Sequence, residues 1–478
     1  MERRVLDPDP ITSFEHYVQD GGGRGLEAAV RLGPVGIIDD VEASGLRGRG
    51  GAGFTTGVKW RAVAQNTSPA LPSTVVVNAA EGEPGSFKDR AIMRRNPYRL
   101  LEGALVAATA VAADRVVLAL KASFHRELER IRHAIDDVRA AGWAEGVELF
   151  VVEGPSEYLY GEETALLEVL AGRNPFPRVS PPFRRGVDDL DPDSRSVAQE
   201  PLAGPDQATV GAPTLVNNVE TLSNVPLILV NGPDWFRAVG TDQSPGTVVC
   251  TVSGHTRRHG VAEFAMGTPL REVLDSIGGG PSPGERVTAV MSGVANPLVP
   301  ESLLDTAVSY EGMEAIETGL GAAGFIVFDD TSDPAAVARG VSRFLAVESC
   351  GQCTPCKQDG LALADLLERL RRSDADENTL AAVEDRVATV ADNARCFLAA
   401  QHQRVVGSIL RLFPDEVRAH ATGAAQAAKD ELIAPILDLD GDLAVLDERQ
   451  AVKQPDWTFD DTYSGQSPAD RARASEPR

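Results

Sequence analysis

Four of the five cysteines in this chain have a spacing that suits a metal centre. Cys350, Cys353 and Cys356 lie within seven residues in the segment ESCGQCTPCK, and Cys396 follows forty residues later. Three thiolates at this spacing can converge on one centre, and a centre with four cysteine ligands needs one more, for which Cys396 is the obvious candidate. Cys250 stands apart in an apolar segment and is expected to be a packed core thiol.

The spacing favours an iron–sulfur cluster over zinc. Structural zinc usually takes two separated pairs of ligands, whereas a C-x-x-C-x-x-C run with a remote fourth cysteine is more typical of a [4Fe-4S] cluster. Zinc stays open as an alternative, and metal-free buried thiols fit clustered cysteines less well. Disulfides are disfavoured because the cysteines are few and the N-terminal MERRVLDPDP contains no apolar signal segment. We therefore expect a cytoplasmic protein that associates with the inner membrane only through a complex.

A glycine-rich segment, GLRGRGGAGFTTGVKW at residues 45–60, is the second candidate site. Such a backbone can approach a ligand closely and present several N–H groups to a phosphate or a flavin. The segment is neither a G-x-G-x-x-G after a clear strand nor a Walker loop, so nucleotide binding and a flexible turn both stay open. Arg47, Arg49 and Lys59 favour an anionic ligand, although they are also compatible with solvated surface charges.

Polar residues follow an expected buried strand at residues 74–77. The loop after this strand presents Asn78, Glu81 and Glu83. Ligands bind at the carboxyl ends of strands in open α/β sheets, so this loop is a candidate ligand site, with a Gly/Pro-rich capped turn as the alternative.

Two further polar groups precede expected helices. Glu162 and Glu163, after Gly161, begin the helical run EETALLEVL, where the helix dipole alone favours carboxylates. Asn217, Asn218 and Thr221 precede or begin an apolar helix, and they could cap this helix or bind a phosphate.

The elements that would position these residues alternate between strand and helix. We expect strands at 74–77, 115–121 and 148–154, and helices at 96–113 and 124–141, which predicts a largely parallel sheet covered on both faces. From residue 247, short strands around one helix predict a small α+β module. Amphipathic segments at 335–349, 357–372, 376–391 and 398–413 predict a helical bundle with the cysteines in its connections. The polar tail after about residue 461 is expected to be disordered.

Composition excludes several classes of function. With 478 residues, 43% hydrophobic and 24% charged, the chain is long enough for about three globular domains. A net charge of −24, from 46 basic and 70 acidic residues, argues against a nucleic-acid partner. No apolar run of 18 residues is present, so we expect no direct membrane insertion.

The sequence resembles the family of NADH-oxidising flavin subunits of respiratory complex I, whose members also occur in NAD-linked hydrogenases and formate dehydrogenases. The resemblance covers about residues 40–413 and rests on five motifs in order: SGLRGRGGAGF-x-x-G-x-KW, NA-x-EGEPG-x-FKDR, Y-x-x-GEETALLE, PT-x-VNNVET and SCG-x-CTPC with a remote cysteine. It implies a Rossmann-like FMN and NADH domain, a ubiquitin-like or SLBB-type module, and a four-helix bundle carrying one [4Fe-4S] cluster. The expected boundaries are 1–244, 245–332 and 333–415, followed by an acidic, partly disordered extension at 416–478.

The resemblance also implies roles for individual residues. Those expected to line FMN are Gly48, Gly50, Gly51, Lys59, Asn78, Gly161, Glu162, Glu163, Val216, Asn217, Asn218 and Thr221. Phe54, Glu83 and Phe183 would face NADH, since an aromatic ring can stack on adenine and a carboxylate can accept from ribose hydroxyls.

The implied activity is NADH oxidation by hydride transfer to FMN, followed by transfer of single electrons through the cluster to a partner. The implied partners are a thioredoxin-like 2Fe-2S subunit and a larger iron–sulfur subunit. Ala80, Ala62 and Ser180 depart from the residues usual in the family, which motivates an alternative: an electron-relay subunit that has kept the cluster and lost effective NADH oxidation.

Overall fold

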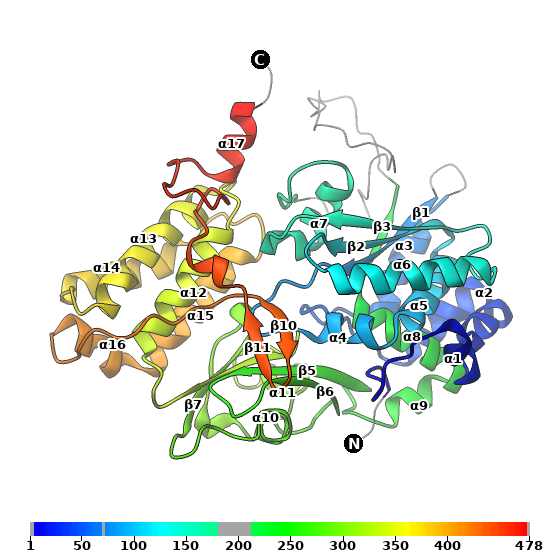
Figure 1. Cartoon of the computed structure of the whole chain (residues 1–478), viewed down its shortest axis with the longest axis horizontal. Coiled ribbons are helices and arrows are strands. Elements are labelled where there is room, and N and C mark those ends of the chain that lie inside the picture. The colour runs from blue at the N-terminus through cyan, green and yellow to red at the C-terminus, as the bar shows by residue number, and fades with distance from the viewer. Residues whose placement is uncertain (1–3, 69–71, 180–211, 476–478) are drawn as a thin grey trace.

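A four-stranded parallel sheet forms the centre of the N-terminal domain. The structure, a computed structural model, describes residues 4–68, 72–179 and 212–475 (Figure 1). The strands are β1 (Ser73–Ala79), β2 (Ala113–Lys121), β3 (Glu148–Gly154) and β4 (Thr214–Asn218), in the order β3-β2-β1-β4. Val75, Val76 and Val77 are fully buried, as expected for a parallel strand covered on both faces. Asn78 pairs with Asn218, so the carboxyl ends of β1 and β4 lie side by side.

Helices cover both faces of this sheet. One face packs on a large apolar core, with α2 (Arg24–Ala43), α5 (Pro97–Val111), α6 (His125–Ala140) and α8 (Val219–Asn231) among its elements. On the other face, α7 (Glu163–Leu170) packs with Tyr160 over a smaller apolar cluster. The predicted α/β class and alternation are therefore confirmed. Shorter helices join these elements: α1 (Phe14–Gln19), α3 (Thr56–Asn66), α4 (Lys88–Arg95), η1 (Tyr158–Gly161) and α9 (Pro233–Arg237).

A mixed five-stranded sheet forms the second unit. Its strands are β5 (Thr247–Gly254), β6 (Gly260–Ala265), β7 (Val287–Ser292), β8 (Val299–Pro300) and β9 (Gly324–Asp329), in the order β6-β5-β9-β7-β8. Helix α10 (Leu270–Gly278) packs Val273, Leu274 and Ile277 into the core of this unit, and α11 (Tyr310–Glu314) contributes Met313. Cys250 is fully buried on β5, so it is the packed core thiol that the sequence predicts.

The helical bundle follows the four predicted segments. Its helices are α12 (Pro334–Glu348), α13 (Thr354–Arg371), α14 (Glu377–Thr389) and α15 (Leu398–Leu412), and a fifth helix, α16 (Pro414–Ala421), packs beside them. The apolar stripes of these helices meet in one core that includes Leu363, Leu367 and Val406. None of the helices in the described part of the chain is long and apolar enough to cross a bilayer.

The C-terminal extension contacts all three units (Figure 1, orange to red). It contains the hairpin of β10 (Ile436–Asp440) and β11 (Leu443–Leu446), and helix α17 (Pro468–Ser475). Arg90 of the N-terminal domain donates to the Leu437 carbonyl at 2.6 Å, and the Ala444 N–H donates to His259 of the second unit at 2.8 Å. Arg343 of the bundle donates to the Gln450 carbonyl at 2.9 Å.

Residues 461–475 also have defined structure, so the expectation of a disordered tail is wrong for this part of the chain. The Asp456 carboxylate accepts from Ser464 at 2.5 Å, and Ser467 with Asp470 forms the start of α17. The Ala469 N–H donates to the Cys350 carbonyl at 2.9 Å. Polar side chains that suggest disorder therefore bond to one another and to the cysteine segment.

Candidate cofactor sites

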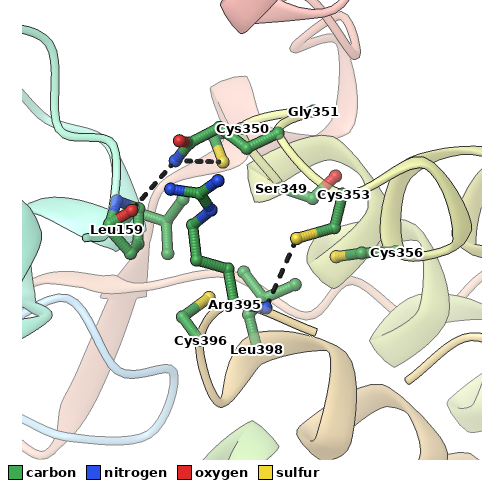
Figure 2. A pocket seen from close by; sticks show the side chains of 11 residues that line it. Leu159, Ser349, Cys350, Gly351, Cys353, Cys356, Arg395, Cys396 and Leu398 are labelled. Atoms are coloured by element: carbon green, nitrogen blue, oxygen red, sulfur yellow. Dashed lines mark hydrogen bonds between the residues drawn. The ribbon is translucent and has the colours of Figure 1, made fainter. Parts of the chain in front are cut away.

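All four predicted cysteine ligands line one pocket of about 270 Å³ (Figure 2). Cys350 and Cys353 lie in the connection between α12 and α13, Cys356 lies in the first turn of α13, and Cys396 lies just before α15. The connection turns sharply at Gly351, whose φ of +89° disfavours other residues. A Cβ at Gly351 would also lie 2.2 Å from the Cβ of Ser467 in the C-terminal extension.

The spacing of these sulfurs fits a polynuclear cluster better than one metal ion. Zinc binds sulfur at about 2.3 Å, so tetrahedral ligand sulfurs lie about 3.8 Å apart. Within residues 4–68, 72–179 and 212–475, no three Cys, His, Asp or Glu side chains are placed to hold a single metal ion. The pocket therefore supports the iron–sulfur interpretation, since four thiolates are the usual ligands of a [4Fe-4S] cluster.

Burial and mutual repulsion raise the pKa of these thiols. Burial raises the pKa of Cys350, and it raises that of Cys396 to about 12. For Cys356, burial and then the neighbouring Cys396, Cys350 and Cys353 raise the pKa well above the ordinary range. Four buried thiolates need a cationic centre to offset this cost, which is what bound iron supplies.

Hydrogen bonds also reach the sulfurs. The backbone N–H of Arg395 donates to Cys353 Sγ at 3.3 Å, and the Gln352 amide donates to Cys350 Sγ at 3.5 Å. Donors to ligand sulfurs are one of the ways in which a protein sets the potential of a cluster.

The predicted flavin residues converge at the carboxyl ends of β1 and β4. The Arg49 N–H donates to Thr221 Oγ1 at 2.8 Å, which joins the glycine-rich loop to the start of α8. A Cβ at Gly50 would lie 3.2 Å from the Cβ of Asn218, so the loop backbone passes close to this residue. Gly51 has a φ of +127° and forms a β-bridge with Gly321 of the second unit.

Two contacts bring the turn at residues 161–163 to the same edge. Asn78 donates to the Gly161 carbonyl at 2.8 Å, and Lys59 forms an ion pair with Glu163. Gly48 closes the glycine-rich loop by donating to the Phe54 carbonyl at 2.8 Å. Four segments that are distant in sequence therefore present glycine backbone, amides and a lysine at one sheet edge, which is a donor set suited to the phosphate and ring of a flavin.

Two of the predicted carboxylates act as helix caps. Glu162 accepts from the N–H groups of Thr164 at 3.0 Å and Ala165 at 2.8 Å, so it caps α7. Glu81 accepts from the Arg90 N–H at 3.2 Å at the start of α4, and burial raises its pKa to about 6. The structural interpretation of the residue-162 carboxylate is thus confirmed, and the same geometry accounts for Glu81.

Arg49, Val216 and Asn217 are committed to the protein interior. The Arg49 guanidinium donates to the carbonyls of Pro245 at 3.1 Å and Thr247 at 3.0 Å, so the expectation that it binds an anionic ligand is not supported. Val216 packs in the apolar cluster under α7. Asn217 accepts from Trp60 Nε1 at 2.7 Å. The side chains of these residues therefore fix the strands and loop around the site.

A buried ionic cluster beside Asn218 was not predicted. Lys88 Nζ lies 2.8 Å from Asp89 and 2.9 Å from Glu220, and all three side chains are buried. Asn218 donates to Asp89 at 2.6 Å. The residues belong to the motifs FKDR and VNNVET, which is the signal that could have found them. The cluster fixes the orientation of the Asn218 amide at the end of β4.

The predicted NADH residues differ in their surroundings. Phe54 is 57% exposed, so its ring is available for stacking. Glu83 accepts from Tyr158 Oη at 2.6 Å and from the Val294 N–H at 2.7 Å. Burial raises the pKa of Glu83 to about 7, and these two donors moderate the shift. Phe183 lies outside the described residues, as does Ser180.

The comparisons with known proteins account for both sites. Residues 41–227 match the Nuo51 FMN-binding domain, and residues 336–420 match the NADH-ubiquinone oxidoreductase-F iron-sulfur binding region. The F-type subunit of NADH-quinone oxidoreductase that is numbered 2 in Rhizobium meliloti (strain 1021) is 35% identical over 415 residues, which are 84% of this chain and 93% of the relative. The chain belongs to the family of F-type subunits of NADH-quinone oxidoreductase.

Another member and a solved structure agree with this assignment. The F-type subunit of NADH-quinone oxidoreductase of Mycobacterium bovis (strain ATCC BAA-935 / AF2122/97) is 35% identical over 436 residues, which are 88% of this chain and 93% of the relative. A solved NAD+-reducing [NiFe]-hydrogenase in the H2-reduced state superposes with a TM-score of 0.73 at 31% identity, covering 86% of this chain and 67% of that chain. The predicted family, fold class and cofactors, FMN and a [4Fe-4S] cluster, are therefore confirmed for this F-type chain.

Proposed function

We propose that this chain is the NADH-oxidising subunit of a multisubunit redox complex. When bound, FMN supplies hydride acceptance and a [4Fe-4S] cluster supplies one-electron chemistry. The residues of the chain bind and orient these groups: the glycine-rich loop with Asn78 and Asn218 at the sheet edge, and the four cysteines in the bundle.

The observation that carries the proposal is that one short segment reaches both sites. Leu159 lines the cysteine pocket, while Gly161 and Glu163 contact Asn78 and Lys59 at the flavin edge. Proximity of two redox sites is the main structural requirement for electrons to pass between them. A rigid connection of five residues, 159–163, keeps the two sites at a fixed separation.

A second contact supports the same coupling. Tyr158 donates to the Glu83 carboxylate and accepts from the Gln401 amide at 2.9 Å. Gln401 lies on α15, the helix that begins directly after Cys396. The residue that we propose to face NADH is therefore linked through one side chain to the bundle that holds the cysteines.

The partners that we propose are a thioredoxin-like 2Fe-2S subunit and a larger iron–sulfur subunit, because the electrons need an acceptor beyond this chain. Copurification from the native source, followed by identification of the bound chains, tests this part of the proposal. Recovery of the chain free of any redox subunit would contradict it.

The activity is tested by NADH-dependent ferricyanide reduction with protein that contains FMN, iron and acid-labile sulfide. We expect turnover with NADH, and a Phe54→Ala variant should show a higher KM with little change in kcat, because stacking contributes to binding of the nucleotide. Full FMN occupancy without turnover would instead favour the relay-only alternative. Ala80, whose methyl is buried in the cluster under α7, is one of the departures that motivate this alternative.

A further inference from the structure

Arg395 places a cation at the edge of the cysteine pocket. Its side chain extends along the pocket from beside Cys396 towards Cys350 (Figure 2). The residue is exposed, and within the described part of the chain its guanidinium has no hydrogen bond or ion pair. Its backbone is held at the site because the Arg395 N–H donates to Cys353 Sγ at 3.3 Å.

Arginines elsewhere in the bundle are neutralised by carboxylates. Arg386 lies 2.7 Å from Asp359, and Arg339 lies 2.9 Å from Glu368. The whole chain carries a net charge of −24, so carboxylates are abundant. A cation that faces four cysteines and has no carboxylate partner among the described residues therefore adds a local positive field that its surroundings do not cancel.

We propose that Arg395 is a positioning residue that raises the reduction potential of the cluster held by the four cysteines. The inference rests on the proposed function only in that a cluster occupies this pocket. Uptake of one electron, supplied by oxidation of the nicotinamide, adds one negative charge to the cluster and its thiolates. A fixed cation beside them stabilises the more negative, reduced state.

The field of Arg395 also depends on salt, because the guanidinium is exposed. Mobile ions screen exposed charges within about 10 Å at 0.1 M ionic strength. The hydrogen bond from its backbone to Cys353 is unaffected by the identity of the side chain. Charge and backbone geometry can therefore be separated by substitution.

The test is a redox titration of the purified, cluster-loaded protein, followed by the electron paramagnetic resonance signal of the reduced cluster. In Arg395→Gln we expect the ratio of reduced to oxidised cluster at fixed potential to fall about fivefold at low salt, from a Coulomb interaction at the protein surface. For a one-electron couple, this is a downward shift of about 40 mV. Arg395→Lys should keep most of the wild-type potential because it retains the charge.

Arg404→Gln is the matched control. Arg404 lies on α15 near Cys396 and is also exposed, but its guanidinium lies 5.0 Å from the Phe397 ring and does not line the pocket. We expect no shift in this variant. An unchanged potential in Arg395→Gln, or an equal shift in Arg404→Gln, overturns the proposal.

Iron and sulfide contents of about four each per chain show that the cluster is intact in each variant. If Arg395→Gln does not load a cluster, the wild-type protein still provides a test: its potential should fall as salt rises, and a potential independent of salt overturns the proposal. None of these readouts requires NADH turnover. Absence of NADH oxidation would refute the proposed function and leave this measurement possible.

Discussion

Loss of the buried ion pair between Lys453 and Glu348 should release the C-terminal extension from the bundle. Lys453 Nζ lies 2.7 Å from Glu348 Oε1, and the two side chains are 6% and 3% exposed. Glu348 also accepts from the Tyr158 N–H at 3.0 Å and from the Gln450 amide at 3.1 Å. The carboxylate therefore joins the end of α12, the segment between the two cofactor sites, and the extension.

In Lys453→Met, the buried carboxylate keeps its neutral donors and loses its counter-ion. Breaking a buried pair in this way costs about 3–5 kcal/mol, and we expect about 3 kcal/mol because the remaining donors still solvate the charge. At 1.4 kcal/mol per tenfold change, this raises the fraction of molecules with an open extension roughly 150-fold.

Limited proteolysis under native conditions measures this opening, since cleavage tracks the open population when closing is fast. We expect cleavage within residues 448–475 to accelerate by about two orders of magnitude. The Glu348→Gln/Lys453→Met double variant should recover most of the loss, because a neutral amide needs no counter-ion. A single variant as resistant as the wild type, or a double variant as labile as the single, would refute the reasoning.

The pH dependence of the wild type gives an independent check. Burial by itself would raise the pKa of Glu348, but Lys453 and the hydrogen-bond donors hold it below its ordinary value of 4.5. The pair therefore contributes its stability fully above pH 4.5, and this contribution is lost as the pH falls towards the folded pKa. Proteolysis of the extension should accelerate on this acid side.

Two further predictions concern the cofactor sites. Cys353→Ala should abolish the paramagnetic signal of the cluster and leave FMN bound, whereas Cys250→Ala, in the core of the second unit, should keep both; a surviving signal in the first variant would mean that the ligands are assigned wrongly. Burial raises the pKa of Glu83 to about 7, so its contribution to the free energy of unfolding falls as the pH rises from 4.5 to about 7. The ionised form repels a 2′-phosphate, so kcat/KM for NADPH relative to NADH should fall roughly tenfold through this range in the wild type and stay constant in Glu83→Gln; a ratio that changes equally in both proteins would contradict this role.

The sequence was sufficient for features that depend on local spacing. The four cysteines could be grouped because Cys350, Cys353 and Cys356 are adjacent in one turn, and the apolar periodicity predicted the helices that carry them. The alternation of strand and helix likewise predicted the parallel sheet. The capping role of Glu162 could be anticipated because a cap depends only on the next few residues.

Features that depend on distant partners could not be predicted. Arg49 is removed from the ligand by the carbonyls of Pro245 and Thr247, which lie in a different unit. Glu83 accepts from Val294 in the same way. No local pattern identifies which charges will be buried by contacts between units.

The prediction for the extension failed for a related reason. Its polar composition indicates disorder when taken alone, since it cannot bury enough apolar surface by itself. Lys453 and Asp456 become ordered only because the bundle and the tail itself supply Glu348 and Ser464. Prediction from composition therefore fails where a polar segment meets a surface that already holds complementary charge.

The hydrogen bond from Ala469 to Cys350 also has a consequence for biogenesis. The ribosome makes all four cysteines before it makes residues 467–469, so the cysteine segment exists for an interval without the strand of chain that later covers it. Iron and sulfide can be delivered to an uncovered pocket during this interval. Once the extension has closed, exchange requires it to open, which the Lys453 and Glu348 pair opposes. The order of synthesis thus separates loading of the cofactor from its retention.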